Sequence, residues 1–236
     1  MATDTSHYPS PDARVTPPGP ERQIGVLLVD DHPAVRLGAR GLIDSQPDMT
    51  VVAQASNADD ALQQITQAID VAIVDYHLGQ GEDGLWLTTQ LKRSETSPRV
   101  LIYSAFADTA LAGMALIAGA DGLIGKHELG AELCWAIRRL ARGQHNLPAV
   151  SPTVAHAMRS RLQPRDQAIF GMLLHGMASE AVAERLSITP EELDARRVLM
   201  LGRFRPAWPP SVLPVGARAP LDYARAGRAT THRRAA

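Results

Sequence analysis

The chain has 236 residues and a formal net charge of −1, with 45% hydrophobic and 21% charged residues. These values are typical of a globular protein, and they exclude binding of nucleic acid through overall positive charge. The single cysteine, Cys134, excludes an internal disulfide framework and fits the reducing cytoplasm, where we expect the protein to act. Residues 1–23 lack the apolar run of a signal peptide, and no apolar run is long enough to cross a bilayer, so we expect no membrane partner.

The first half of the chain alternates short apolar runs with amphipathic segments. Residues 1–22 contain five prolines and little that could pack, which predicts a disordered leader. Over residues 23–142, five repeats of the alternation predict an α/β domain, a parallel sheet with helices on both faces. The expected strands are Ile24–Val29, Thr50–Ala55, Val71–Val74, Arg99–Tyr103 and Gly122–Ile124. The expected helices are Ala34–Ser45, Ala58–Ala68, Leu85–Arg93, Asp108–Ala118 and Ala131–Arg142.

The second half of the chain shows helical patterns only. Residues 143–161 contain two prolines and predict a linker, with a short helix near Thr153–Arg161. Residues 162–205 predict a small all-α domain, because no strand pattern interrupts their apolar periodicity. Residues 206–236 contain five prolines and a basic final stretch, which predicts a disordered basic tail.

Reactive side chains come directly after four of the apolar runs in the first half. The carboxyl ends of parallel strands meet at one edge of a sheet, where ligands collect. Any one of these side chains alone would be an ordinary turn residue, but their joint position favours phosphate chemistry with a divalent metal. Carboxylates would hold the cation, while an ammonium and a hydroxyl would contact phosphate oxygens. The residues are Asp30, Asp31, Asp75, Ser104 and Lys126.

These residues stand within short motifs that occur in a fixed order, namely Leu27–His32, Val74-Asp75, Ser104-Ala105, and Gly119–Gly122 followed by Lys126. Together the motifs resemble the receiver domain of bacterial two-component response regulators over residues 24 to about 142. The resemblance implies a flavodoxin-like (βα)5 fold with strand order 2-1-3-4-5, and phosphorylation of Asp75 by a histidine kinase. It also implies Mg²⁺ held by Asp30, Asp31 and Asp75, with Ser104 as the switch hydroxyl and Lys126 as a phosphoryl contact.

One position departs from the receiver pattern. Receivers of this kind usually carry an aromatic switch residue three positions before the lysine, where this chain has Leu123. A leucine cannot adopt the buried and exposed ring states of such a residue. The resemblance therefore implies intact phosphoryl chemistry with an altered output switch.

The all-α segment carries the motifs Leu162–Asp166, Leu174–Met177 and Ala183–Thr189. They resemble the helix-turn-helix of LuxR/NarL-type regulators over residues 162–205, and the resemblance implies a recognition helix from about Pro190 to Leu201 in the DNA major groove. Thr189 and Glu192 have the spacing of a capping box at the start of this helix. The candidate DNA contacts are Thr189, Glu192, Arg196, Arg197 and Arg203.

The local charge of this segment departs from that of a DNA-binding module. Residues 162–205 contain six basic and six acidic residues, whereas phosphate contacts normally require a basic surface. Asp194 stands where the family carries a basic residue. The family's fourth, dimerising helix should follow, but Arg205–Pro210 contains three prolines and cannot continue a helix.

We therefore predict a response regulator without enzymatic activity of its own, phosphorylated on Asp75 by a histidine kinase and regulating transcription through its helix-turn-helix. The expected partners are the kinase and DNA. A second copy of the chain is a further candidate partner, in a homodimer formed on phosphorylation. The alternative is a phosphorylation-controlled protein-interaction switch whose helix-turn-helix no longer binds DNA. A hydrolase of the haloacid-dehalogenase type is disfavoured, because His77 stands where that class has a second aspartate.

Overall fold

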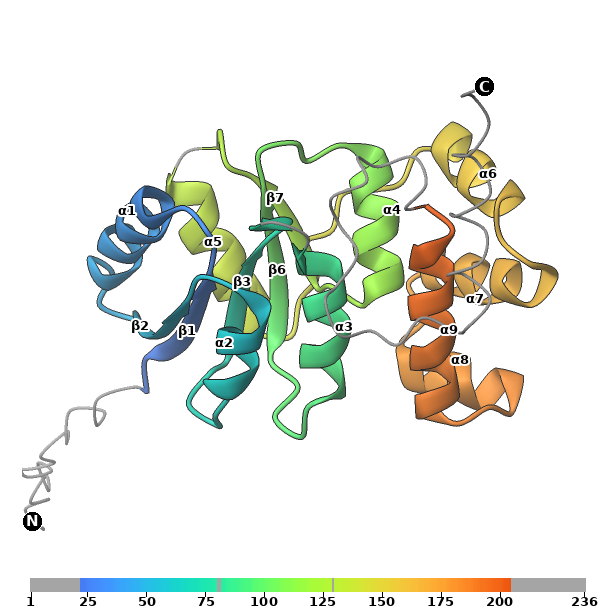
Figure 1. Cartoon of the computed structure of the whole chain (residues 1–236), viewed down its shortest axis with the longest axis horizontal. Helices are drawn as coiled ribbons and strands as arrows, with labels where there is room; N and C mark the ends of the chain where they lie inside the picture. The colour runs from blue at the N-terminus through green and yellow to red at the C-terminus, as the bar shows by residue number, and fades with distance from the viewer. Residues whose placement is uncertain (1–21, 80–81, 129, 205–236) are drawn as a thin grey trace, which may run out of the picture.

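The structure is a computed structural model that describes residues 22–79, 82–128 and 130–204. Its centre is a parallel five-stranded sheet with the strand order β2-β1-β3-β6-β7, which confirms the predicted flavodoxin-like topology (Figure 1). The strands are β1 (Ile24–Val29), β2 (Met49–Ala55), β3 (Val71–Asp75), β6 (Arg99–Ser104) and β7 (Gly122–Gly125). The predicted leader and basic tail lie outside the described residues, apart from Arg22.

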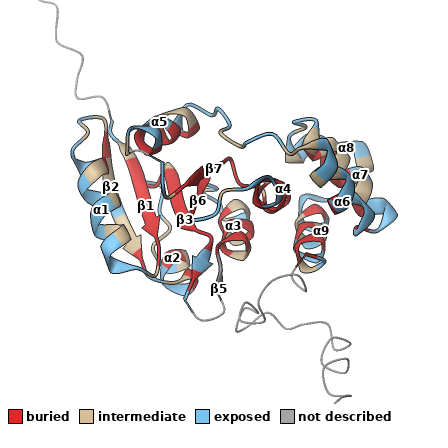
Figure 2. Ribbon diagram, turned by 90° about the horizontal axis from the view of Figure 1, so that it is seen from above, coloured by how far each residue is buried: buried red, intermediate tan, exposed pale blue. Residues whose placement is uncertain are grey.

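Helices cover both faces of the sheet, as the alternating pattern predicts (Figures 1 and 2). One apolar cluster joins the sheet to the helices α1 (Pro33–Asp44) and α5 (Gly130–Ala141). The other joins the opposite face to α2 (Ala58–Gln63), α3 (Gly84–Arg93) and α4 (Thr109–Ala118). Strands β1, β3, β6 and β7 are almost wholly buried because both of their faces are covered, which explains why they read as continuous apolar runs. The edge strand β2 is only partly buried.

Two local details differ from the sequence prediction. Helix α2 ends at Gln63 instead of Ala68, and a turn closed by a hydrogen bond from the Ile69 amide to the Thr66 carbonyl follows it. The β-branched Ile65 and Thr66 favour this exit, because such side chains lose rotamer freedom in a helix. A short antiparallel pair, β4 (His77–Leu78) and β5 (Glu82–Asp83), also follows β3, and its two-residue strands are too short for a periodicity to reveal them.

Between residues 143 and 204 the structure describes four further helices, α6 (Pro152–Ser160), α7 (Pro164–Leu174), α8 (Ser179–Leu186) and α9 (Pro190–Gly202). Helix α9 begins with the predicted capping box, in which the Thr189 hydroxyl accepts from the Glu192 amide and the Glu192 carboxylate accepts from the Thr189 amide. The position expected for a fourth, dimerising helix lies outside the described residues.

Helix α4 lies between the sheet and the C-terminal helices (Figure 2). It is apolar on nearly all sides, and helices α6, α7 and α9 pack against the side that faces away from the sheet. Gly113 makes room for this packing, since a Cβ there would come within 2.4 Å of the Met158 sulfur. One apolar cluster therefore runs from the sheet through α4 to Phe170, Met200 and Phe204 of the C-terminal helices.

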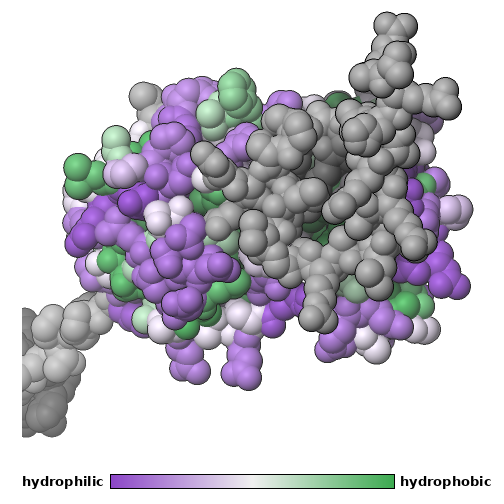
Figure 3. Space-filling model, viewed as in Figure 1, coloured by the Kyte–Doolittle hydropathy of each residue, from purple (hydrophilic) through white to green (hydrophobic). Residues whose placement is uncertain are grey.

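Most of the described surface visible in Figure 3 is hydrophilic, with separate hydrophobic side chains between the polar ones. Within the described residues, no helix combines the length and the apolar character that a membrane span needs.

Candidate functional site

The predicted reactive residues lie together at the carboxyl ends of the central strands. Asp30 and Asp31 follow β1, and Asp75 is the last residue of β3. In the sheet, Asp75 is level with Tyr103, and Ser104 is level with Gly125, which directly precedes Lys126. The register of the parallel strands therefore collects side chains that are up to 96 positions apart in the sequence.

Lys126 bridges two of the carboxylates. Its Nζ lies 2.6 Å from Oδ2 of Asp30 and 2.7 Å from Oδ2 of Asp75, and its side chain is only 17% exposed. Burial alone would lower the pKa of Lys126, but the hydrogen bonds and charges of the two carboxylates raise it above its ordinary value. The ammonium is thus held protonated between the two groups.

Asp75 is the more deeply placed carboxylate, with 4% of its surface exposed. Burial raises the pKa of Asp75 and the charge of Asp30 adds to the rise, while Lys126 opposes it. Lys126 is therefore the group that favours the ionised, nucleophilic form of Asp75. The backbone around Asp75 also requires a glycine at position 84, because a Cβ there would lie 2.0 Å from the Asp75 carbonyl oxygen.

Asp75 belongs to a cluster of possible metal ligands, three carboxylates and one imidazole. One donor atom from each of Asp30, Asp31, His32 and Asp75 lies within 4.8 Å of the others, so the cluster can hold a metal ion. The backbone orients two of the carboxylates, since the His32 amide donates to Asp30 and the Gly79 amide donates to Asp31. Three carboxylates form a donor set that suits a hard divalent cation.

The Ser104 hydroxyl lies in the same region, and its residue is 1% exposed. Its Oγ accepts from the Phe106 amide at 3.2 Å and donates to the Phe106 carbonyl at 3.3 Å. A hydroxyl has one hydrogen, so donation to another acceptor would break the bond to the Phe106 carbonyl. Phe106 itself is 77% exposed at the start of the loop that leads to α4.

Tyr103 is a neighbour of the site that the sequence motifs do not identify. The Lys126 Nζ lies 5.8 Å from the centre of its ring, and burial raises the pKa of its phenol. Leu123, at the position of the absent aromatic residue, is 3% exposed and belongs to the apolar cluster of α4. The ring nearest the lysine thus comes from β6 and not from β7.

The candidate DNA contacts do not form one free surface in this structure. Thr189 and Glu192 are engaged in the capping box of α9, while Arg203 is exposed. Arg196 lies 3.3 Å from the buried carboxylate of Asp166. Arg197 is 3% exposed, so it is not accessible to a DNA phosphate in this arrangement.

Helix α9 packs against α3 and α4 of the α/β domain. Arg93 of α3 lies 3.6 Å from Asp194 of α9, which gives a role to the acidic residue that departs from the family pattern. Arg197 donates to the Ser179 hydroxyl at 2.6 Å, and its guanidinium fills the space where a Cβ of Gly119 would otherwise stand. The face of α9 that carries Asp194 and Arg197 is therefore directed at the α/β domain.

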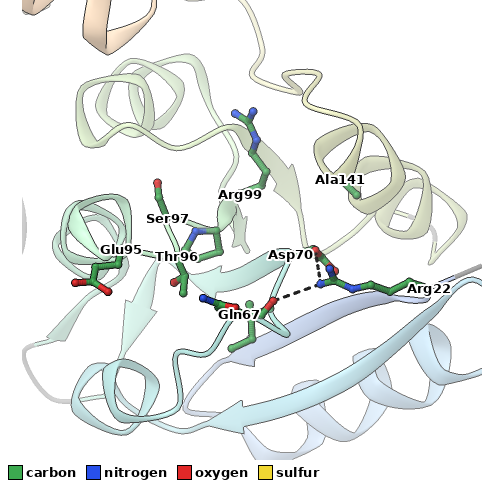
Figure 4. Close-up of a pocket in the computed structure, with 10 residues that line it drawn as sticks. Arg22, Gln67, Asp70, Glu95, Thr96, Ser97, Arg99 and Ala141 are labelled. Carbon is green, nitrogen blue, oxygen red and sulfur yellow. Dashed lines mark hydrogen bonds and ion pairs between the residues drawn. The ribbon is translucent and has the colours of Figure 1, made fainter.

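A second polar centre lies at the amino ends of the strands, opposite the ends where Asp75 lies. Asp121 is 2% exposed and accepts from Lys92 at 3.0 Å, from Arg99 at 2.7 Å and from the Val100 amide at 2.8 Å. Arg99 also lines a cleft of about 410 Å³, in which Arg22 reaches Asp70 while the Arg99 side chain points away from that pair (Figure 4). Burial would raise the pKa of Asp121, but its basic partners and the Val100 amide lower it below the ordinary value. These contacts join strands and helices and serve stability.

Known proteins resemble the chain along most of its length. The response regulator receiver domain family matches residues 26–138. The nitrate/nitrite response regulator protein NarL of Escherichia coli strain K12 is 29% identical over 192 residues, which cover 76% of this chain and 88% of NarL. A crystal structure of a LuxR-family two-component response regulator from an Aurantimonas species is 33% identical with a TM-score of 0.50, covering 57% of this chain and 94% of that chain.

A further solved structure, the receiver domain of a NarL response regulator from Mycobacterium tuberculosis, is 30% identical with a TM-score of 0.50 and covers 52% of this chain and 100% of that chain. The fold, the strand-end carboxylates and these similarities agree. The chain belongs to the response regulators of two-component systems, with LuxR- and NarL-type regulators as its relatives.

Proposed function

We propose that a histidine kinase phosphorylates this response regulator on Asp75 and that the phosphoryl group controls a DNA-binding C-terminal domain. The observation that carries the proposal is the bridge of Lys126 between Asp30 and Asp75. It places a cation beside Asp75, a carboxylate of the described cluster that is deeply buried at the end of β3.

The chemistry follows from the positions of the groups. An ionised Asp75 oxygen attacks the phosphorus of a phosphohistidine, the P–N bond breaks, and an acyl phosphate forms. Lys126 contacts a phosphoryl oxygen as a point charge, and Ser104 donates its single hydroxyl hydrogen to another. Asp30, Asp31 and Asp75 would hold Mg²⁺, which supplies positive charge that offsets repulsion between carboxylate and phosphate.

The site is tested by incubating the protein with acetyl phosphate and Mg²⁺ and measuring the intact mass. The wild type should gain one acid-labile phosphoryl group, and Asp75→Asn should gain none. Asp59→Asn, which changes an exposed carboxylate on α2, is the matched control and should behave as the wild type. Equal phosphorylation of wild type and Asp75→Asn would rule out the assignment.

The output is proposed to be DNA binding by α9, supported by relatives that are named as transcriptional regulators. In this structure α9 packs on α3 and α4, so binding in a major groove requires α9 to leave that position. The candidate contacts Arg196, Arg197 and Arg203 would then approach phosphates.

The alternative, a protein-interaction switch, is favoured by one feature of α9. Its first turn carries Glu191 and Glu192, and its outer side exposes Val198 at 38% and Leu199 at 53%. Acidic and apolar side chains suit a protein partner better than DNA phosphates. Electrophoretic mobility shifts with random-sequence DNA at low salt, with and without beryllofluoride, separate the two functions. A complete lack of binding in both states would support the protein-interaction switch.

A further inference from the structure

Among the described contacts of the Lys126 ammonium, one is with a group that carries no charge. Its two carboxylate partners, Asp30 and Asp75, also belong to the cluster that can hold a metal ion. The third neighbour is the face of the Tyr103 ring, whose centre lies 5.8 Å from Nζ. An aromatic face attracts a cation at this range, and the attraction is larger where water is largely excluded.

The register of the sheet places the Tyr103 ring beside Lys126. In the sheet register, Tyr103 of β6 pairs with Asp75 of β3 on one side and with Ile124 of β7 on the other. Ile124 stands two residues before Lys126 in the sequence. The Tyr103 side chain is half-buried and packs into the apolar cluster of α1 and α5. It also lines a small cleft together with Val35 and Ala39 of α1.

No other ring offers the same contact to the lysine among the described residues. Leu123 pairs with Ile102 in the sheet register, and its side chain packs on the opposite face of the sheet, against α4. Tyr76, next to Asp75, also belongs to that opposite cluster. The ring contact of Lys126 is therefore specific to the face covered by α1 and α5.

We propose that Tyr103 is a positioning residue for Lys126, and that its ring keeps the ammonium at Asp75 when the carboxylates take other partners. The proposal rests on the proposed phosphorylation of Asp75. A cation or a phosphoryl group that arrives at this cluster competes with the ammonium for the same carboxylates. The ring does not take part in this competition, so it keeps Lys126 close enough to contact a phosphoryl oxygen.

The test measures the initial rate of phosphorylation by acetyl phosphate in the presence of Mg²⁺. Tyr103→Leu removes the ring and keeps an apolar side chain, and it should slow phosphorylation about three- to tenfold. Tyr103→Phe keeps the ring and should stay within about twofold of the wild type. Trp135→Leu is the control, because it also removes a ring that contacts a cation. The Trp135 ring lies on the exposed side of α5, and its centre is 4.7 Å from Cζ of Arg139. The rate of Trp135→Leu should not change.

A double-mutant cycle separates positioning from a general loss of structure. In a Lys126→Ala background, the change from Tyr103 to Leu should alter the rate by less than about twofold, because the partner of the ring is gone. An equal loss of phosphorylation rate in both backgrounds would overturn the proposal. So would a Tyr103→Phe rate as low as that of Tyr103→Leu, or a Tyr103→Leu rate equal to that of the wild type.

A second measurement does not depend on phosphorylation. A ring face near the ammonium shifts the side-chain hydrogens of Lys126 to high field in the NMR spectrum of selectively labelled protein. The shift should persist in Tyr103→Phe and disappear in Tyr103→Leu, and its absence in the wild type would refute the contact. If the shift is present but the wild type takes up no phosphoryl group, the function assigned to Asp75 fails while the ring contact stands.

Discussion

At the scale of single residues, the site is organised by a competition for carboxylate oxygens. Lys126 occupies one oxygen of Asp30 and one of Asp75, the same residues that belong to the possible metal cluster. A divalent cation at this cluster must share or displace the ammonium. The position of these residues at one sheet edge was predictable, because each follows an apolar run. The pairing of Lys126 with Asp30 was not, because no motif shows which of several carboxylates a lysine will reach.

This competition predicts the behaviour of Lys126→Ala toward Mg²⁺. Removal of the ammonium frees two carboxylate oxygens and eliminates a repelling charge, so Mg²⁺ should bind at least as tightly as in the wild type. Phosphoryl-dependent changes in the protein should nevertheless weaken. Isothermal titration with Mg²⁺ measures the first effect, and a clearly weaker affinity in Lys126→Ala would contradict the account.

Asp121 gives a prediction about pH. Its lowered folded-state pKa means that the ionised form stabilises the fold above the ordinary aspartate pKa of about 3.9, and that this contribution is lost as the pH falls through the folded-state value. Asp121→Asn should therefore lower the free energy of unfolding by roughly 2 kcal/mol at neutral pH. Urea denaturation of both proteins should show this difference shrinking below about pH 4. A difference that is constant with pH would argue against the ionic role of Asp121.

At the scale of elements, local sequence chemistry determines most boundaries. The capping box of α9 and the five parallel strands follow from residue spacing and apolar runs. The sequence does not indicate the early end of α2, because its apolar spacing continues through Ile65 while the β-branched pair Ile65 and Thr66 favours a turn. It does not indicate the ring contact between Tyr103 and Lys126 either, since that contact depends on the register between β6 and β7.

The capping box predicts the effect of a change at Thr189. Thr189→Ala removes the oxygen that accepts from the Glu192 amide, and it should lower the stability by about 1 kcal/mol. Thr189→Ser keeps the oxygen and should cost only a few tenths of that amount. Thermal unfolding followed by circular dichroism compares the two. Equal losses for alanine and serine would show that the cap does not stabilise α9.

At the scale of the whole molecule, the packing of α9 on the α/β domain hides part of the proposed output surface. The sequence indicates Arg197 as a DNA contact, because basic residues on a recognition helix usually face phosphates. In the structure, the Arg197 guanidinium is instead buried against Gly119. Gly119 has a left-handed backbone conformation with φ of 88°, and its lack of a Cβ leaves room for the guanidinium. Charge patterns within one segment cannot show which of its residues meet another domain.

The docking of Arg197 on Gly119 can be tested with a matched pair of glycines. Gly119→Ala should strain the turn and push the guanidinium away, because its Cβ would lie 2.2 Å from a guanidinium nitrogen. Gly176→Ala strains a turn with φ of 74° outside the segment that is probed, and its Cβ would meet no atom within 4 Å apart from its chain neighbours. Limited proteolysis of residues 143–151 should therefore be faster only in Gly119→Ala. Equal cleavage of the two variants would show that this contact does not hold the domains together.

The central claim is that Asp75 accepts a phosphoryl group, and peptide mapping tests it most directly. After incubation with acetyl phosphate and Mg²⁺, reduction with borohydride converts an acyl phosphate into a stable alcohol that mass spectrometry locates. The account predicts that this mark appears on the peptide that contains Asp75, at Asp75 itself. A mark on Asp30 or Asp31 instead, or no mark on any peptide, would contradict the account.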